Sequence, residues 1–296
     1  MAQSPKKPHL VSEVLLKQWS RPIPGNDKAI TTFYVEFGTV NFKSPAAICY
    51  AKDLSTRDSQ EFEDTWQSVE SKIGRILPRI NAGSQVDTNT NPVLQEFLAV
   101  HLVRSFSYRE RHRRRMLQGI QALDLRRVPS ERLVSMDGKK HSEPYPPYMN
   151  DRVRIEEEWR SNLTELFVNG PYSAEAMMTI LPYARDYIDR RSLTIVHAGD
   201  GDSEFVVGDC PVLPLKGSSG LAEEPFGPAV GAYFFPVGPK YGLFTANRNS
   251  DLAPHEVAWL NCLQVQSAQK WVVWTPDRDF AGFAKSVRDA SSSFQS

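Results

Sequence analysis

The chain has 296 residues, of which 41% are hydrophobic and 24% are charged, as is typical of a soluble globular protein. Its 35 acidic and 35 basic residues balance, so no overall charge draws it to nucleic acid or to a membrane surface. No apolar run approaches the ~20 residues of a membrane-spanning helix, and the first residues lack the apolar core of a signal peptide. Three widely spaced cysteines without a CxxC pair favour a reducing cytoplasm and argue against a structural zinc site.

The first part of the chain is predicted to form a short helix, a strand and a longer helix. His9 precedes an apolar helical pattern, so we expect it at a helix N-terminus, where the dipole favours the neutral imidazole. Residues 30–37 alternate between apolar and polar side chains, which predicts a strand. From Ser59 onward, apolar residues recur at three- and four-residue steps, which predicts an amphipathic helix. Glu70 lies beside that apolar face, either as a partly desolvated carboxylate or as a surface residue with its charge in water.

A second long helix is predicted from residues 91–92, an Asn-Pro pair that supplies an N-cap and a proline at the first helical position. One broad face of this helix carries His101, Arg104 and Tyr108 at three- and four-residue spacings. Side chains at these spacings are neighbours on a helix, so we expect the three to converge.

The same helix is predicted to end in the one strong basic patch of the sequence. This run could contact nucleic acid, or it could be a solvated helix end that complements the helix dipole. The arginines that would contact nucleic acid are Arg109, Arg111, Arg113, Arg114 and Arg115.

The central segment, residues 123–151, combines charged runs with a stretch rich in proline and tyrosine, which is typical of a rigid connector. Helices are predicted after it over residues 153–167 and 174–181, the second ended by Pro182. From residue 191 onward the pattern changes to strand. Residues 193–197 and 204–207 predict a β-hairpin across a turn of glycine and aspartate. The later elements expected are strands at 231–236 and 242–246, a helix at 254–270 and a closing strand at 271–274.

These patterns together predict an α+β protein with a single domain, residues 1–296. A helix-rich part, residues 1–190, would pack on a strand-rich part, residues 191–290, whose sheet is mostly antiparallel.

The stretch at residues 205–215, FVVGDCPVLPL, places a carboxylate where an apolar strand meets a sharp break. Asp209 would be held rigidly there, either for binding or catalysis, or simply to cap a turn. Arg104 lies in an apolar run and needs a buried anion, which Asp209 or Glu70 could supply. Cys210 is a poor candidate for a nucleophile because its negative neighbour raises the thiol pKa. The sequence contains neither a GxSxG elbow nor a phosphate-binding loop.

Several segments, taken in order, resemble an uncharacterised bacterial family, the domain of unknown function 4238. The matching segments are His9–Trp19, the helix around Glu70, Phe97–Arg109, Phe205–Val212, Phe235–Pro239 and Val257–Trp274. The sequence departs from the family pattern at an early proline, at two hydroxyl residues and at an asparagine. The residues found there are Ser12, Val207, Gly208 and Cys210. The resemblance implies a shared fold and a shared site, but the family brings no settled activity.

The resemblance also groups five polar residues from five separate elements, which would converge on one site: His9, Glu70, Arg104, Asp209 and Asn261. One hypothesis is a cytoplasmic bacterial hydrolase of phosphodiesters, such as a nuclease acting in defence or as a toxin. Arg104 would hold the phosphate and His9 would act as general acid or base. Glu70 and Asp209 would orient the histidine or a metal ion.

In this hypothesis His101, Tyr108 and Asn261 would bind the substrate. Two carboxylates, a histidine and an asparagine would suit magnesium or manganese, although no DxD or HxH spacing supports a metal. The alternative hypothesis is a non-catalytic binding or interaction module, in which the same histidine, glutamate, arginine and aspartate form a buried ionic network that fixes the packing.

Overall fold

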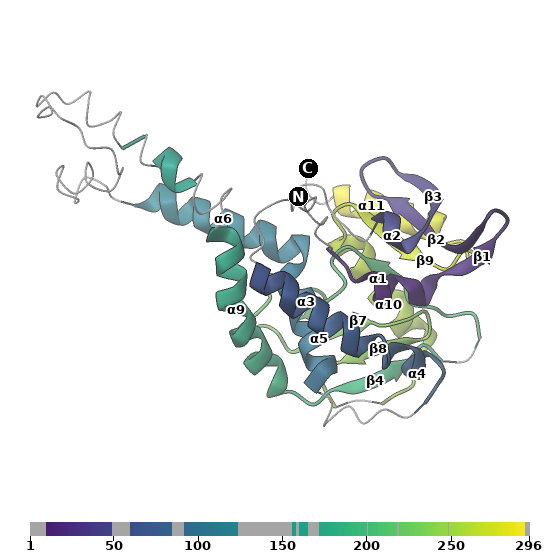
Figure 1. Cartoon of the computed structure of the whole chain (residues 1–296). Helices are drawn as coiled ribbons and strands as arrows, with labels where there is room; N and C mark the ends of the chain where they lie inside the picture. The colour runs from purple at the N-terminus through teal and green to yellow at the C-terminus, as the bar shows by residue number, and fades with distance from the viewer. Residues whose placement is uncertain are drawn as a thin grey trace, which may run out of the picture.

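The structure is a computed structural model, and it confirms the α+β prediction: helices pack on antiparallel sheets (Figure 1). Two sheets are present in the part of the chain that is described. The described residues are 10–48, 60–84, 92–123, 156–157, 160–164, 172–199, 201–217, 219–247 and 249–293. The predicted connector at 123–151, apart from residue 123, and most of the predicted helix at 153–167 therefore lie outside the described residues.

The first sheet joins the two ends of the chain. Its strands are β1 (Arg21–Ile23), β2 (Asn26–Tyr34), β3 (Thr39–Lys43), β5 (Val207–Gly208) and β9 (Trp271–Trp274). β9 pairs antiparallel with β2 on one side and with β5 on the other, while β3 pairs with β2. The strand predicted at 271–274 is thus confirmed, but it is central to its sheet and does not close an edge.

The second sheet has the order β4-β8-β7-β6, with every pair antiparallel. Its strands are β4 (Thr194–His197), β6 (Leu213–Leu215), β7 (Ala232–Pro236) and β8 (Tyr241–Phe244). The predicted hairpin between 193–197 and 204–207 is wrong, because β4 pairs with β8 and β5 with β9. The reason is burial. Phe205, Val206 and Val207 belong to three different hydrophobic clusters, so this segment passes from one cluster to the next and does not pair with β4.

Helices cover both sheets. Those with described bounds are α1 (Glu13–Leu16), the 3-10 helix η1 (Lys17–Trp19), α2 (Pro45–Ile48), α3 (Gln60–Ile73), α4 (Leu77–Asn81), α5 (Pro92–Arg104), α6 (Phe106–Ala122), α9 (Tyr172–Asp189), α10 (Pro254–Ser267) and α11 (Ala281–Ser293). α5 packs against both α3 and α9 and is apolar on nearly every side, as expected of a helix inside a core. α10 packs on the second sheet, and α11, which was not predicted, covers one face of the first.

The helix predicted to continue from residue 92 through Arg115 breaks at Ser105. Ser105 has an extended ψ of 147°, and its hydroxyl accepts a hydrogen bond from the Tyr108 amide. It is therefore the N-cap of a new helix, α6. The expectation that Pro182 ends a helix is also wrong, since Pro182 lies inside α9. Among the described residues, no helix is long and apolar enough to cross a membrane.

Candidate functional site

A buried polar junction forms where α1, α3 and α5 meet. The indole of Trp66 on α3 lies between two side chains of α5: its ring centroid is 4.7 Å from that of His101 and 4.4 Å from Cζ of Arg104. Both contacts follow from the apolar stripe of α3, which turns Trp66 toward α5. An arginine over an indole face is stabilised by the ring quadrupole, more so away from water.

His101 connects α5 to the start of α1. Its Nε2 accepts from the Ser12 amide at 3.2 Å, and its Nδ1 lies 2.9 Å from the Phe97 carbonyl oxygen, to which it must donate. Burial, with Arg104 nearby, lowers its pKa to about 3, although the bond to Phe97 partly opposes this. A neutral imidazole with both nitrogens engaged has a positioning role rather than the role of an acid or base.

Arg104 is fully buried and donates to the Glu63 carboxylate at 2.5 Å. The prediction that Asp209 or Glu70 answers this charge is therefore wrong. Glu63 lies one turn before Trp66 on the same face of α3, and it reaches the end of α5 while 22% of its side chain remains exposed. The position of Glu63 one turn before the tryptophan was the sequence signal that could have identified it.

The buried polar atoms around this junction that have no hydrogen-bond partner among the described residues include Ser12 Oγ, Trp66 Nε1 and Glu70 Oε1. Glu70 follows Trp66 by one turn of α3, and the backbone of Ser12 bonds His101, so the three residues lie around one junction. Unpaired buried groups of this kind usually mark a place for water or a polar ligand. His9, which the sequence predicts for the site, lies outside the described residues.

Asp209 lies elsewhere, in the turn after β5. Its two carboxylate oxygens accept from the amides of Gln269 at 2.9 Å and Lys270 at 2.6 Å. Its own amide donates to the Trp271 carbonyl at 3.2 Å. Burial raises the pKa of Asp209 to about 6, and these hydrogen bonds oppose the rise. The carboxylate fixes the turn between α10 and β9, which supports the capping interpretation of this residue.

Asn261 on α10 binds the strand that leads to Asp209. Its side chain accepts from the Val206 amide at 3.0 Å and donates to the Glu204 carbonyl at 2.7 Å. One turn later, Gln264 accepts from the Gly208 amide at 3.0 Å and donates to the Pro211 carbonyl at 2.8 Å. The side-chain amides of Asn261 and Gln264 thus hydrogen-bond the backbone of residues 204–211 as a neighbouring strand would. Gln264 was not predicted, although its three-residue spacing from Asn261 indicates the same helix face.

Tyr108 is not brought to Arg104 or His101 within the described structure, because the break at Ser105 redirects α6. Its ring packs edge-on against Phe226, with centroids 6.0 Å apart, and burial raises its pKa to about 12. The predicted convergence of the three side chains is therefore wrong. It assumed one continuous helix.

The basic run on α6 binds mostly to other groups of the protein. Arg109 donates to the Arg104 carbonyl at 3.3 Å, and Arg111 to the Ala222 carbonyl at 3.5 Å, where burial lowers its pKa. The remaining contacts are Arg113 with Glu110 at 3.7 Å, Arg114 with Glu110 at 3.1 Å, and Arg115 with Glu224. Two glutamates thus offset part of this charge, and nucleic-acid binding stays a prediction.

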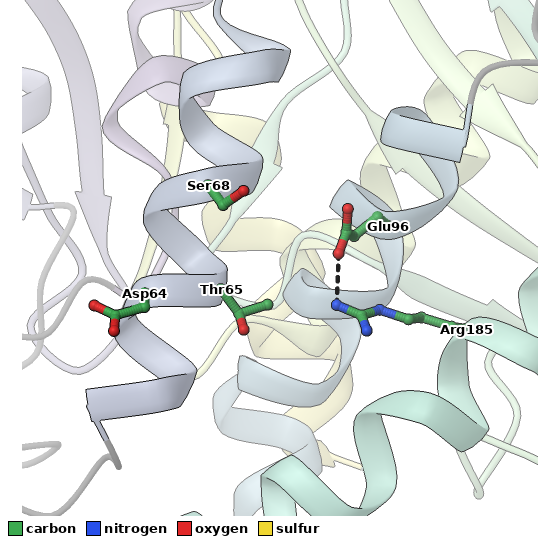
Figure 2. A pocket seen from close by; sticks show the side chains of 5 residues that line it. All are labelled: Asp64, Thr65, Ser68, Glu96 and Arg185. Atoms are coloured by element: carbon green, nitrogen blue, oxygen red, sulfur yellow. Dashed lines mark hydrogen bonds and ion pairs between the residues drawn. The ribbon is translucent and has the colours of Figure 1, made fainter.

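An open pocket of about 470 Å³ lies between α3, α5 and α9 (Figure 2). Figure 2 shows Thr65 and Ser68 of α3 on the side that faces Glu96 of α5 and Arg185 of α9, while Asp64, which also lines the pocket, points away from them in this view. The Arg185 guanidinium donates to Glu96 at 2.5 Å. This pocket was not predicted from the sequence, although charged residues within largely apolar helices were a usable signal.

The described residues hold no group of three or more histidine, cysteine, aspartate and glutamate side chains that could bind a metal ion. Two of the groups proposed for magnesium or manganese, Asp209 and Asn261, bind backbone atoms instead. The described part of the chain therefore supplies no ligand set that fits such an ion.

These features define an α+β protein with two antiparallel sheets, a buried polar junction and an open polar pocket. The family model for the protein of unknown function DUF4238 matches residues 7–278, so the chain belongs to this family and the resemblance is confirmed. Comparison with curated proteins and with solved structures gives no match.

Proposed function

We propose that this protein is a non-catalytic binding module, a rigid α+β scaffold whose pocket between α3, α5 and α9 receives a polar partner. One observation carries the proposal: polar side chains that the sequence assigns to catalysis or to substrate binding are bound to other groups of the fold. These side chains are His101, Arg104, Asp209 and Asn261.

Catalytic acids and bases must exchange protons with a substrate and need a pKa near the working pH. His101 has both nitrogens engaged and a pKa of about 3. Asp209 is wholly buried, with both oxygens on backbone amides. Buried networks of this kind fix packing without chemistry, so these residues are better suited to hold a binding surface.

The pocket suits a polar peptide segment of a partner protein. Sites for small molecules are usually concave and mostly apolar, whereas this pocket is open and lined by hydroxyls and charges. The Glu96–Arg185 pair and Asp64 offer groups of both signs, and Thr65 and Ser68 can donate and accept hydrogen bonds. A peptide backbone with polar side chains matches this mixture.

The test selects random displayed peptides on the folded protein and measures their binding by titration. We expect selected peptides to lose binding to Ser68→Trp, which fills the pocket, and to keep binding to Ser71→Trp. Ser71 is exposed on the same helix and does not line the pocket. Equal binding to both variants, or no enrichment, would contradict the proposal.

One observation favours the second candidate, a cytoplasmic bacterial phosphodiesterase or nuclease: the buried atoms of Ser12, Trp66 and Glu70 at the junction of α1, α3 and α5 have no hydrogen-bond partner among the described residues. In that case His9 and Glu70 would share acid and base roles, and the arginines of α6 would attract the nucleic acid. The wild type would then cleave single-stranded RNA or DNA with magnesium or manganese. Glu70→Gln would abolish turnover without lowering the melting temperature.

A further inference from the structure

The strand β3 presents an unpaired edge at the surface. All five of its residues are exposed, and within the described part of the chain it pairs with β2 alone. Figure 1 shows β3 at the edge of its sheet, near α2. A strand edge of this kind carries free N–H and C=O groups that can template pairing with another strand.

The exposed side chains of this edge are apolar on one face. Val40 is 38% and Phe42 is 55% exposed, and they stand opposite Phe33 and Thr31 of β2. On that face α11 and the end of α10 cover Phe33 and the neighbouring β9, but neither β3 residue belongs to this cluster. The sheet therefore has an apolar margin that its own helix leaves uncovered.

We propose that this margin is a self-association surface, on which β3 pairs antiparallel with β3 of a second copy about a two-fold axis through Asn41. The sequence Thr39–Lys43 is self-complementary in this register. Val40 faces Phe42 of the second copy, and Lys43 faces Thr39, so apolar side chains meet and no like charges are opposed.

Side-chain pairing favours this register, with the axis at Asn41, over shifted registers of the same two strands. A shift of one residue would place Val40 and Phe42 opposite polar side chains, because successive residues point to opposite faces. A shift of two would leave strand ends unpaired. With the axis at Asn41 all five residues pair, and the two α11 helices lie on the same side of one continuous sheet. A contact of one short strand per copy is small, so the dimer is weak and concentration-dependent.

Sedimentation equilibrium tests the association. The wild-type mass should rise from the monomer value of 33.4 kDa toward twice that value with increasing concentration. Phe42→Lys puts a charge on the apolar margin and should weaken the dimer at least ~10-fold. Tyr183→Lys, at a distant side chain that is 52% exposed, is the matched control and should leave the dimer unchanged. A wild type that stays monomeric at every concentration would overturn the proposal.

Cross-linking tests the register without relying on Phe42. In a background with Cys49 and Cys262 changed to serine, Asn41→Cys places two thiols opposite each other across the axis. Directly opposed residues have Cα atoms roughly 4.5–5.5 Å apart, within the span of a disulfide. Thr39→Cys, opposite Lys43, should not cross-link with itself. Equal cross-linking of both variants, or none at Asn41→Cys, would contradict the pairing.

Discussion

A buried histidine that bridges two helices does so only in its neutral form. His101 has a pKa lowered from 6.5 to about 3 by burial, so protons bind the unfolded chain first as the pH falls. The stability that this residue contributes is complete above pH 6.5. It is lost toward lower pH, at up to roughly 1.4 kcal/mol per pH unit.

We therefore predict that the wild type loses stability relative to His101→Gln as the pH falls below 6.5, measured by urea melts at several pH values. The glutamine oxygen can still accept from Ser12 but does not titrate. His255→Gln, which removes an exposed histidine of α10, is the control. A stability difference that does not change with pH would show that His101 is not held neutral.

Asp209 makes the stability of the fold depend on pH in the opposite direction. Its folded pKa of about 6 exceeds its usual 3.8, mainly because of burial, so between these values the folded protein keeps a proton that the unfolded chain releases. Relative to Asp209→Asn, the wild type should lose up to roughly 1.4 kcal/mol per pH unit as the pH rises from 3.8 to about 6. Urea melts over this range, with exposed Asp277→Asn as the control, measure the slope. If the wild type instead gained stability relative to Asp209→Asn as the pH rises, the backbone hydrogen bonds would outweigh burial in setting the pKa of Asp209.

The Glu63–Arg104 pair allows a double-mutant cycle. Glu63→Gln leaves a buried guanidinium without its carboxylate, and should lower the free energy of unfolding by about 3 kcal/mol. Arg104→Met should cost less, because the remaining carboxylate is partly exposed. The double mutant should recover part of the loss, with a coupling energy of about 1–3 kcal/mol in urea melts. Additive losses would indicate that the pair is not coupled.

At the scale of elements, long and regular patterns were predictable and local exceptions were not. The three- and four-residue apolar steps identify α3 and α5, and β7 and β8 follow from their apolar runs. The break at Ser105 is invisible to that periodicity, because apolar residues continue on both sides of Arg104 and Ser105, and only the structure shows that the serine becomes a cap. The pairing of β4 could not be predicted because strand partners depend on which faces are buried, a property of the assembled fold.

The candidate site shows the same limit. The apolar run around Arg104 predicted that it is buried, and it is; His101, predicted only as its neighbour on the same helix face, is buried as well. Their partners, Glu63 and the Ser12 amide, come from other helices 41 and 89 residues away along the chain. Because one sequence gives no distance between elements, it predicts that a buried charge needs a partner but does not identify it.

The amide pair on α10 leads to a prediction for the element as a whole. Asn261→Leu leaves the Val206 amide and the Glu204 carbonyl buried without partners, which should cost about 2–6 kcal/mol at about 1–3 kcal/mol each. Asn261→Asp keeps an acceptor for Val206 and, when its carboxyl is protonated, an O–H donor for the Glu204 carbonyl, so in mildly acidic buffer it should be less harmful than Asn261→Leu. Thermal melts of both variants measure this. Equal loss in both would mean that the hydrogen bond to Val206 contributes nothing.

At the scale of the whole molecule, contacts between distant parts of the chain suggest one cooperative unit. The main hydrophobic cluster includes residues of α1, α3, α5, α9 and both sheets. The Trp19 indole near the start of the chain donates to the Phe205 carbonyl at 2.8 Å, across 186 residues. The largest core is therefore shared by the helix-rich and strand-rich parts, although a second cluster lies wholly within the strand-rich part.

We therefore predict that residues 1–296 unfold as a single domain. Buried tryptophans report from both parts of the chain, Trp19 and Trp66 from the helical part and Trp271 and Trp274 from the first sheet. Their fluorescence and the far-ultraviolet circular dichroism should change at the same urea concentration, because one core is lost at once. Trp66→Phe serves as the control, since it removes one helical reporter and should not shift one probe relative to the other. Two separated transitions, one in fluorescence and one in helicity, would instead show that the chain divides into two domains.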